Sequence, residues 1–296
     1  MASISIVIVA YNSGELLRRC LAAVGSGHDE IVVVDNGSPE GAPELPRESV
    51  RLIRQPRNDG FGSAANAGVA ATSGRWVLLL NPDAWPIEDG LERLVDFAEG
   101  RPGLGAAGPL LFDTEGQPQR STIRPPLGPG PLALWTAFPG LVTGLYGAWR
   151  RATGPLRRGS VRPAEFLQGA ALLVRRKAFE QVSGFDERFF MYGEDADLCA
   201  RLRDAGWEVA LCESARFEHV GGGSTRSDPE RMRLELLRSW LRLIAKHGGI
   251  GRAERARRWT LLAVRVRRLA SRSPRLRKIS TWLASGDARE LLGRPE

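Results

Sequence analysis

The sequence predicts an α/β fold, with a mainly parallel central sheet flanked by helices and a basic helical extension at the C-terminal end. The composition supports a globular core, because 43% of the 296 residues are hydrophobic and 26% are charged. In the first half, short β-rich runs alternate with helical patterns. Residues 230–296 hold 18 basic and 6 acidic side chains, whereas residues 1–229 hold 24 and 28. The net charge of +8 therefore belongs to the extension and says little about what the main domain binds.

Hydrophobic runs place the elements of the main domain, residues 1–228. Strands are expected at residues 4–10, 30–34, 50–54 and 76–80, with later strands at 170–175 and near Val209. Helices are expected between the first two strands and at residues 62–71, 177–182 and 195–205. This alternation of strands and helices predicts a sheet covered by helices.

Residues 120–165 are rich in Pro and Gly, which predicts a long irregular insertion. Such a loop is either a solvated connection or a flap that faces a membrane or covers an acceptor. Its uncharged run, residues 125–149, is long enough to span a bilayer, but its five Pro and five Gly would break a helix. We therefore expect no transmembrane helix there.

The N-terminal hydrophobic run and the cysteines argue against a secreted protein. The run lacks a preceding basic region and alternates too much for a signal peptide, so we interpret it as a buried strand. Cys20, Cys199 and Cys212 are far apart and lack metal-ligand spacing. Neither a disulfide framework nor a zinc cluster is indicated, and a reducing compartment fits best.

Polar clusters follow three predicted strands, at residues 11–13, 35–38 and 81–83. Ligand groups collect at the carboxyl ends of strands in open α/β sheets, so these clusters should share a crevice. Asp35 is placed to accept hydrogen bonds from a ligand, or else to form an Asx turn. Asp83 is placed to hold a divalent cation together with diphosphate oxygens, or else to lie in a simple turn.

Acidic residues and a histidine further along the chain are candidates for chemistry. Glu194 and Asp195 begin a predicted helix after an aromatic segment, residues 189–192. Capping needs only one acid, so we favour an acid pair in a sheltered pocket, as a general base requires. A lone His is usually structural, but His219 becomes a candidate metal ligand beside an acidic strand end, and imidazole suits Mn²⁺ better than Mg²⁺.

Together these motifs resemble the family 2 inverting glycosyltransferases, which have the Rossmann-like GT-A fold. Within that family they are similar to the rhamnosyltransferase-like branch that acts on lipid-linked glycans. The resemblance covers about residues 3–226. It is carried by residues 5–12, 33–38, 58–62 with Asn66 and Gly68, 80–83, 184–190, 194–198 and His219.

The resemblance implies a role for each candidate residue. Asp195 is the catalytic base, and Glu194 is a like charge that keeps its pKa from falling too low. Asp83 and His219 hold Mg²⁺ or Mn²⁺, while Asn81 replaces the first acid of the family's Asp-x-Asp motif and lowers the local negative charge. The donor nucleotide is bound by Tyr11, Asn12, Asp35, Asn58, Asp59 and Asn81. The acceptor or donor-sugar side is lined by Gln168, Gly169, Phe185 and Asp186.

Residues 229–296 form the basic extension, with amphipathic helices expected at 231–247 and 253–270. Such helices bind anionic lipid, or their apolar faces pack on the catalytic domain or on a second subunit in a homodimer. Nucleic acid is not expected, because no aromatic platform accompanies the charge. The expected location is cytoplasmic, at the inner face of the plasma membrane.

The prediction is a metal-dependent inverting transferase whose partners are a nucleoside-diphosphate sugar and a lipid-linked glycan acceptor. The expected sugar is L-rhamnose from dTDP-rhamnose, transferred to a polyprenyl-linked or other cell-envelope glycan. One alternative is another donor, such as a UDP-hexose. A second is a catalytically silent scaffold that binds membrane or nucleic acid. A third, a nucleotidyltransferase, would need a Gly/Lys/Arg-rich loop near the first strand, and none is present.

Overall fold

The computed structural model describes residues 3–25, 30–41, 43, 45, 49–122, 125–142, 162–163, 166–221, 228–271 and 273–293. The chain divides into two units. We call them the α/β unit, Met1–Arg124 with Arg158–Ser227, and the helical unit, Pro125–Arg157 with Asp228–Glu296. Part of the segment predicted as an insertion, residues 125–142, thus belongs to the helical unit.

A mixed sheet forms the centre of the α/β unit. Its strands are β1 (Ile4–Ala10), β2 (Glu30–Asp35), β3 (Val50–Arg54), β4 (Trp76–Leu80), β5 (Ala84–Pro86), β6 (Leu104–Phe112), β7 (Arg162–Pro163), β8 (Ala171–Arg175) and β9 (Glu208–His219). They lie in the order β3-β2-β1-β4-β8-β6-β9-β5, and β7 pairs with β9. The first four strands are parallel to one another, as predicted, and β8 joins β4 in the antiparallel sense.

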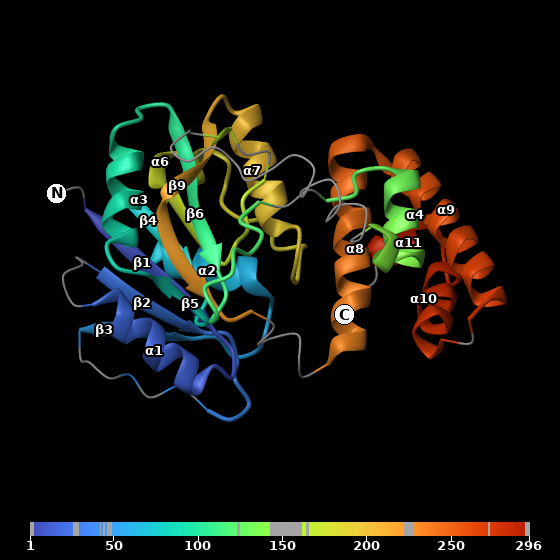
Figure 1. Ribbon diagram of the computed structural model, residues 1–296, viewed down its shortest axis with the longest axis horizontal. Helices are drawn as coiled ribbons and strands as arrows, with labels where there is room; N and C mark the ends of the chain where they lie inside the picture. The colour runs from blue at the N-terminus through green and yellow to red at the C-terminus, as the bar shows by residue number, and fades with distance from the viewer. Residues whose placement is uncertain are drawn as a thin grey trace. The chain divides into compact units, whose positions relative to one another are not determined.

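Helices cover both faces of this sheet, which explains why every residue of β1 and β4 is buried. They are α1 (Gly14–Val24), α2 (Phe61–Ala70), α3 (Gly90–Glu99), α6 (Arg176–Gln181) and α7 (Glu194–Asp204). Figure 1 shows α1 and α3 on one side of the strands and α7 on the other. A Cβ on Gly68 of α2 would lie 2.3 Å from Val7 Cγ1, so only glycine lets α2 approach the sheet this closely.

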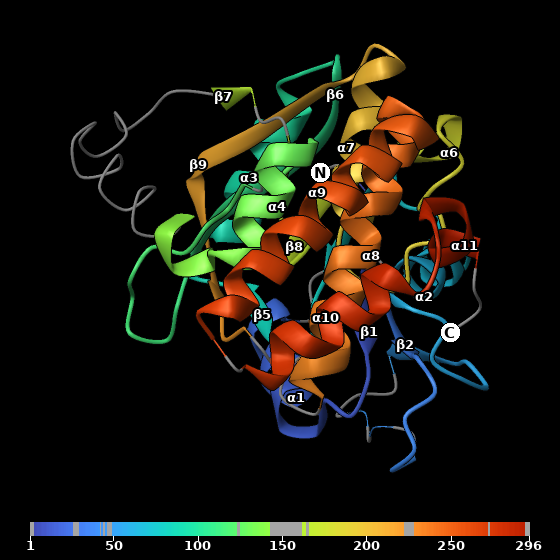
Figure 2. The same ribbon diagram turned by 90° about the vertical axis from the view of Figure 1, so that its right-hand side faces the viewer.

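The helical unit has its own hydrophobic core. Its helices are α4 (Pro129–Ala137), α8 (Pro229–Gly248), α9 (Ile250–Leu269), α10 (Pro274–Ala284) and α11 (Ala288–Gly293). Helices α4, α8 and α10 pack against α9 (Figure 2). Leu237, Leu241 and Ile244, on the predicted apolar face of α8, are buried in this core, and Trp240 contacts Trp135 of α4 edge to face. The apolar face of α8 is therefore used within the unit.

Helix α4 corrects the expectation of irregular structure throughout residues 120–165. Pro129 and Pro131 lie in its first turn, where the missing N–H group has no helical partner to lose. Leu132 and Ala137 then reach the core of the helical unit. Among the helices in the described part of the chain, none is long and apolar enough to cross a membrane.

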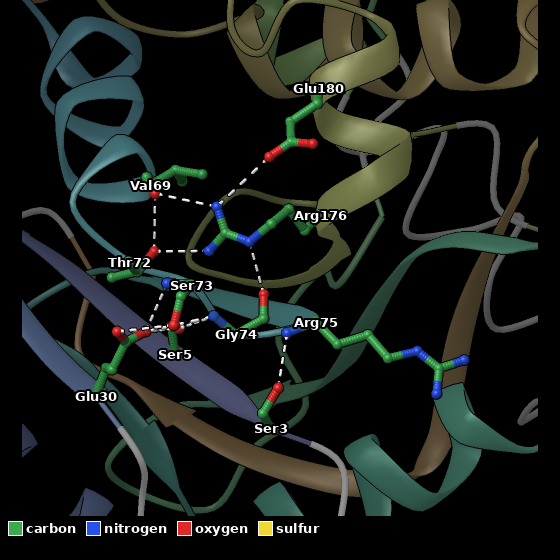
Figure 3. Close-up of polar contacts among 10 residues, drawn as sticks. All are labelled: Ser3, Ser5, Glu30, Val69, Thr72, Ser73, Gly74, Arg75, Arg176 and Glu180. Atoms are coloured by element: carbon green, nitrogen blue, oxygen red, sulfur yellow. Dashed lines mark hydrogen bonds and ion pairs between the residues drawn. The ribbon is translucent and has the colours of Figure 1, made fainter.

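A hydrogen-bond network fixes the amino-terminal edge of the sheet (Figure 3). The Glu30 carboxylate accepts bonds from Ser5 Oγ at 2.5 Å, Ser73 N–H at 2.7 Å and Gly74 N–H at 3.3 Å. Arg176 donates from Nε to the carbonyl of Gly74 at 2.7 Å. Burial disfavours ionisation of Glu30, but these donors outweigh it and lower its pKa. The network holds the turn before β4 against β1 and β2.

We expect Glu30→Gln to lower the free energy of unfolding by about 1–2 kcal/mol near neutral pH, because an amide accepts fewer charge-assisted hydrogen bonds than a carboxylate. The folded-state pKa of Glu30 is depressed, so the stabilisation is present above its unfolded pKa and is lost as the pH falls. Urea unfolding measures the change. Glu180→Gln is the control, because Glu180 pairs with Arg176 at 3.7 Å with 62% of its side chain exposed. Equal destabilisation by Glu30→Gln and Glu180→Gln would contradict a stabilising role for the hydrogen bonds of Glu30.

Candidate functional site

The carboxyl ends of β1, β2 and β4 lie side by side, and the predicted polar clusters follow them. Ala10 pairs with Asp35, and Ile8 pairs with Leu80. Tyr11 begins the first cluster, and its backbone N–H donates to Ser13 Oγ at 3.0 Å. The N–H of Asn12 donates to Ser38 Oγ at 3.0 Å, which ties the first cluster to the second. The structure thus gathers residues 11–13, 35–38 and 81–83 at one edge of the sheet.

Asp35 is buried and has two differently engaged carboxylate oxygens. Oδ1 accepts a hydrogen bond from the N–H of Ser38 at 3.1 Å, which is the turn that we considered as an alternative to ligand binding. Oδ2 has no hydrogen-bond partner among the described residues, and Arg54 Nε of β3 lies 3.5 Å from it. Asp35 therefore shapes the turn and keeps one buried acceptor available to a ligand.

Asn58 and Asp59 lie in the loop before α2. Asn58 Oδ1 accepts bonds from Asn36 Nδ2 at 3.0 Å and from Gly60 N–H at 3.1 Å, so it supports the loop internally. Asp59 pairs with Arg57 at 2.7 Å. A role for either residue in binding a nucleotide stays a prediction.

Gly60 joins this loop to the segment at 185–190. Its φ is 93°, and a Cβ there would lie 2.3 Å from the carbonyl oxygen of Phe190. The N–H of Phe61 donates to that same oxygen at 3.1 Å. Only a glycine allows this close approach of the two backbones.

The segment before β8 connects the strand ends to the predicted base. The N–H of Asn81 donates to the carbonyl of Ala170 at 2.9 Å, and the N–H of Gly169 donates to Asp195 Oδ2 at 3.0 Å. A Cβ on Gly169 would lie 3.4 Å from that oxygen. Gln168 is adjacent, with its N–H bonded to the carbonyl of Ser121 at 3.1 Å.

The acid pair Glu194 and Asp195 is buried in the first turn of α7. Burial raises the pKa of Asp195 to about 6, although the N–H groups of Gly169 and Ala196 donate to it and oppose the shift. Burial, together with the charge of Asp195, raises the pKa of Glu194 well above its usual range. Glu194 Oε2 has no hydrogen-bond partner in the described chain. A buried carboxylate with a raised pKa is suited to accept a proton near neutral pH.

The third acid of this segment has a different environment. Asp197 is fully buried but pairs with Arg201 at 2.7 Å, one turn along α7. Asp197 therefore stabilises the helix, whereas Glu194 and Asp195 make no ion pair with any described residue.

Asp83 and His219 are brought together by the pairing of β5 with β9, in which Ala84 lies opposite His219. His219 Nε2 lies 3.7 Å from Asp83 Oδ1, and both side chains are about one-tenth exposed. Burial lowers the pKa of His219 against the opposing charge of Asp83, which favours a neutral imidazole. A carboxylate oxygen and an imidazole nitrogen that converge in this way fit the donor set of Mn²⁺ or Mg²⁺.

Gln119 fixes the orientation of this imidazole, and no sequence signal identified it. Its Nε2 donates to the backbone carbonyl of His219 at 2.7 Å, so its Oε1 faces His219 Nδ1 at 2.9 Å and must accept. Nδ1 therefore carries the proton, and the lone pair of Nε2 points toward Asp83. Such hydrogen bonds orient metal-binding histidines in proteins.

The remaining predicted residues lie in the segment that contacts Gly60. Phe185 is buried between the rings of Phe61 and Phe179, with both centroid distances at 5.7 Å. Asp186 pairs with Arg188 at 2.6 Å. The structure thus gives Phe185 a packing role, and contact of either residue with a sugar stays a prediction.

The fold is that of the GT-A glycosyltransferases, as two solved structures indicate. GalNAc-T7, crystallised with UDP, GalNAc and Mn²⁺, matches with a TM-score of 0.59 and 14% identity over 99% of this chain and 56% of that one. The mannosyltransferase PcManGT from Pyrobaculum calidifontis, in complex with GDP-Man and Mn²⁺, matches with a TM-score of 0.55 and 14% identity over 98% of this chain and 85% of that one. At this identity the likeness concerns the fold.

Sequence similarity identifies the family. Residues 5–182 match the model of glycosyl transferase family 2, and residues 149–285 match that of glycosyl transferase family group 2. The chain is 34% identical over 285 residues to the N-acetylglucosaminyl-diphospho-decaprenol L-rhamnosyltransferase of Mycobacterium tuberculosis, covering 86% of this chain and 88% of that protein. The chain therefore belongs to glycosyltransferase family 2.

We expect Gln119→Leu to release the ring of His219 into a mixture of tautomers, because Nδ1 loses its acceptor. Nitrogen-15 NMR of the imidazole groups measures this, and the chain has only three histidines to assign. The wild type should show a protonated Nδ1 and an unprotonated Nε2. Gln117→Leu, an exposed position in the same turn, is the control. An unchanged tautomer in Gln119→Leu would refute the orienting role.

We expect Asp195→Asn to stabilise the protein by about 1–2 kcal/mol at pH values above 7. The folded pKa of Asp195 lies above its ordinary value of 3.8, at about 6, so folding disfavours ionisation. The wild-type protein therefore loses stability as the pH rises from 3.8 to about 6, and Asp195→Asn should have no stability advantage below that range. Urea unfolding at both pH extremes tests this. Asp197→Asn should instead destabilise at high pH, because it leaves Arg201 unpaired. A destabilised Asp195→Asn at high pH would contradict our interpretation.

Proposed function

We propose that this protein is a metal-dependent inverting glycosyltransferase that moves L-rhamnose from dTDP-L-rhamnose to a polyprenyl-diphosphate-linked glycan. The observation that carries the catalytic part is the buried carboxylate of Asp195, which makes no ion pair with a described residue and is joined through residues 168–170 to the polar strand ends. The sugar and the acceptor rest on the 34% identity to the mycobacterial protein, whose name specifies an N-acetylglucosaminyl-diphospho-decaprenol L-rhamnosyltransferase.

The donor nucleotide binds at the carboxyl ends of β1, β2 and β4. Asp35 Oδ2, a buried acceptor without a hydrogen-bond partner in the described chain, receives an N–H of the base, and Arg54 lies beside it. Tyr11 borders the same edge, and Asn81 presents an amide to the ribose or a phosphate. No cluster of three or more His, Cys, Asp or Glu that could hold a metal occurs among the described residues, so Asp83 and His219 would share the ion with diphosphate oxygens. When bound, Mn²⁺ or Mg²⁺ neutralises charge on the leaving diphosphate.

Asp195 performs the proton transfer. Its carboxylate takes the proton from an acceptor hydroxyl while that oxygen attacks the anomeric carbon of the donor sugar. The bond from that carbon to the diphosphate oxygen breaks, and the nucleoside diphosphate leaves from the opposite face, so the configuration inverts. Burial keeps the base poised, because a pKa of about 6 leaves it ionised at neutral pH yet able to accept a proton.

A lipid-linked acceptor requires the enzyme to work at a bilayer surface. We therefore propose peripheral association with the cytoplasmic face of the plasma membrane, in line with the positive charge of the C-terminal residues.

The test is nucleotide release and sugar transfer from a panel of dTDP-, UDP- and GDP-sugars, with Mn²⁺ or Mg²⁺ and a polyprenyl-diphosphate-linked N-acetylglucosamine acceptor. We expect metal-dependent activity with dTDP-L-rhamnose, a reduction in kcat of about 10²–10⁴-fold in Asp195→Asn, and loss of this metal-dependent activity in Asp83→Ala. Asp89→Asn, at an exposed position on the surface, is the control and should be fully active. Transfer from a UDP-hexose alone would replace the donor assignment. Full activity of Asp195→Asn would exclude it as the base.

A further inference from the structure

Helix α9 has two apolar faces, and only one of them packs against the helical unit. The buried face consists of Ala253, Ala256, Thr260 and Val264. The other consists of Trp259, Leu262, Val266 and Leu269, which are 59%, 64%, 53% and 89% exposed. We call these four residues the apolar stripe. Their spacing of three, four and three residues places them in one row, roughly half a turn around the helix from the buried face.

The apolar stripe is not explained by folding. Single exposed hydrophobic residues are common on soluble proteins, but four large ones in a continuous row indicate an interaction surface. Both basic helices were expected to carry an apolar face that binds lipid or packs on protein. The structure buries the apolar face of α8 in the core, together with one face of α9, and leaves the apolar stripe of α9 exposed.

Unneutralised positive charge surrounds this row. Residues 255–286 contain ten basic side chains and no acidic one. Arg257 and Arg258 pair with Glu254, and Lys278 pairs with Glu230. No ion pair within the described part of the chain involves Arg265 or Arg277.

These two arginines line a hollow where α9 ends and α10 begins. Its volume is about 350 Å³, and it is lined by Arg265, Arg268, Leu269, Ser271, Ser273 and Arg277. Leu269 belongs to the apolar stripe as well, so the row of hydrophobic side chains leads directly into a cationic hollow. Guanidinium groups and hydroxyls are the donors that bind phosphate oxygens in proteins.

We propose that the apolar stripe and this hollow form a docking surface for an anionic phospholipid bilayer. The stripe enters the boundary between headgroups and acyl chains, and the hollow binds a lipid phosphate. Charge complementarity favours lipid over a second copy of the chain, because two such surfaces would bring the same arginines together. The inference extends the proposed function by naming the surface that brings the enzyme to its acceptor, but it does not depend on the sugar.

The test is co-sedimentation of the full chain with phosphatidylcholine vesicles that do or do not contain phosphatidylglycerol. We expect binding only to the anionic vesicles. Arg265→Gln/Arg277→Gln should weaken it about 30-fold, since each cation contributes about 1 kcal/mol near the surface. Leu262→Ser/Leu269→Ser should weaken it about tenfold.

Three controls make the result specific. Arg18→Gln/Arg93→Gln removes the same charge from exposed positions of the α/β unit and should bind vesicles like the wild type. Asp195→Asn should also bind normally, which separates docking from failure of the proposed chemistry. Both docking variants should keep their unfolding midpoints and their activity toward a water-soluble acceptor analogue.

Equal binding to neutral and anionic vesicles, or unchanged binding by both docking variants, would overturn the proposal. So would a dimer in solution that Leu262→Ser/Leu269→Ser dissociates while vesicle binding persists, because that result assigns the apolar stripe to a second copy of the chain.

Discussion

The position of β8 is the constraint on which the candidate site depends, because this strand enters the sheet antiparallel to β4. Residues 168–170 precede it and therefore lie at the edge where the parallel strands end. Two hydrogen bonds exploit that position, one from Asn81 to Ala170 and one from Gly169 to Asp195. A single stretch of backbone thus sets the separation between the place where a diphosphate would leave and the group that would take a proton. Displacing β8 would alter both sides of the reaction together.

Much of the fold was predictable where burial dictates composition. Strands β1, β2 and β4 are buried on both faces, so they are continuous hydrophobic runs whose limits the sequence marks clearly, whereas β3 is partly exposed and carries Arg51 and Arg54. Strand β6 was missed because Gly105, Gly108 and Pro109 interrupt its hydrophobic pattern. Helix α4 was missed because prolines normally argue against a helix, and here they begin one. In both cases packing against neighbouring elements overrides the local preference.

The site was predictable as a set of residue types but not as a set of partners. Asp83 and His219 carry a recognisable chemistry, and the pairing of β5 with β9 places them together. Gln119 belongs to no sequence motif, and an isolated amide in a turn cannot be distinguished from an ordinary surface residue. Only the folded structure places it against His219. Asp35 is a third case. Its turn-forming and ligand-binding roles were considered as alternatives, but Oδ1 forms the turn while Oδ2 has no hydrogen-bond partner among the described residues. Sequence patterns identify reactive groups, and only tertiary structure reveals what orients them.

The close contact between Gly60 and Phe190 couples two loops that are about 130 residues apart in the chain. The first loop follows the strands where we propose that the nucleotide binds, and the second leads into the acid pair, so neither loop has an independent shape. Exchange of one loop with a relative, in evolution or in the laboratory, would bring mismatched backbones together. If the two loops serve the donor and the acceptor as we propose, the two preferences would be inherited as a linked pair, and chimeric enzymes built to alter one of them would need both segments from the same parent.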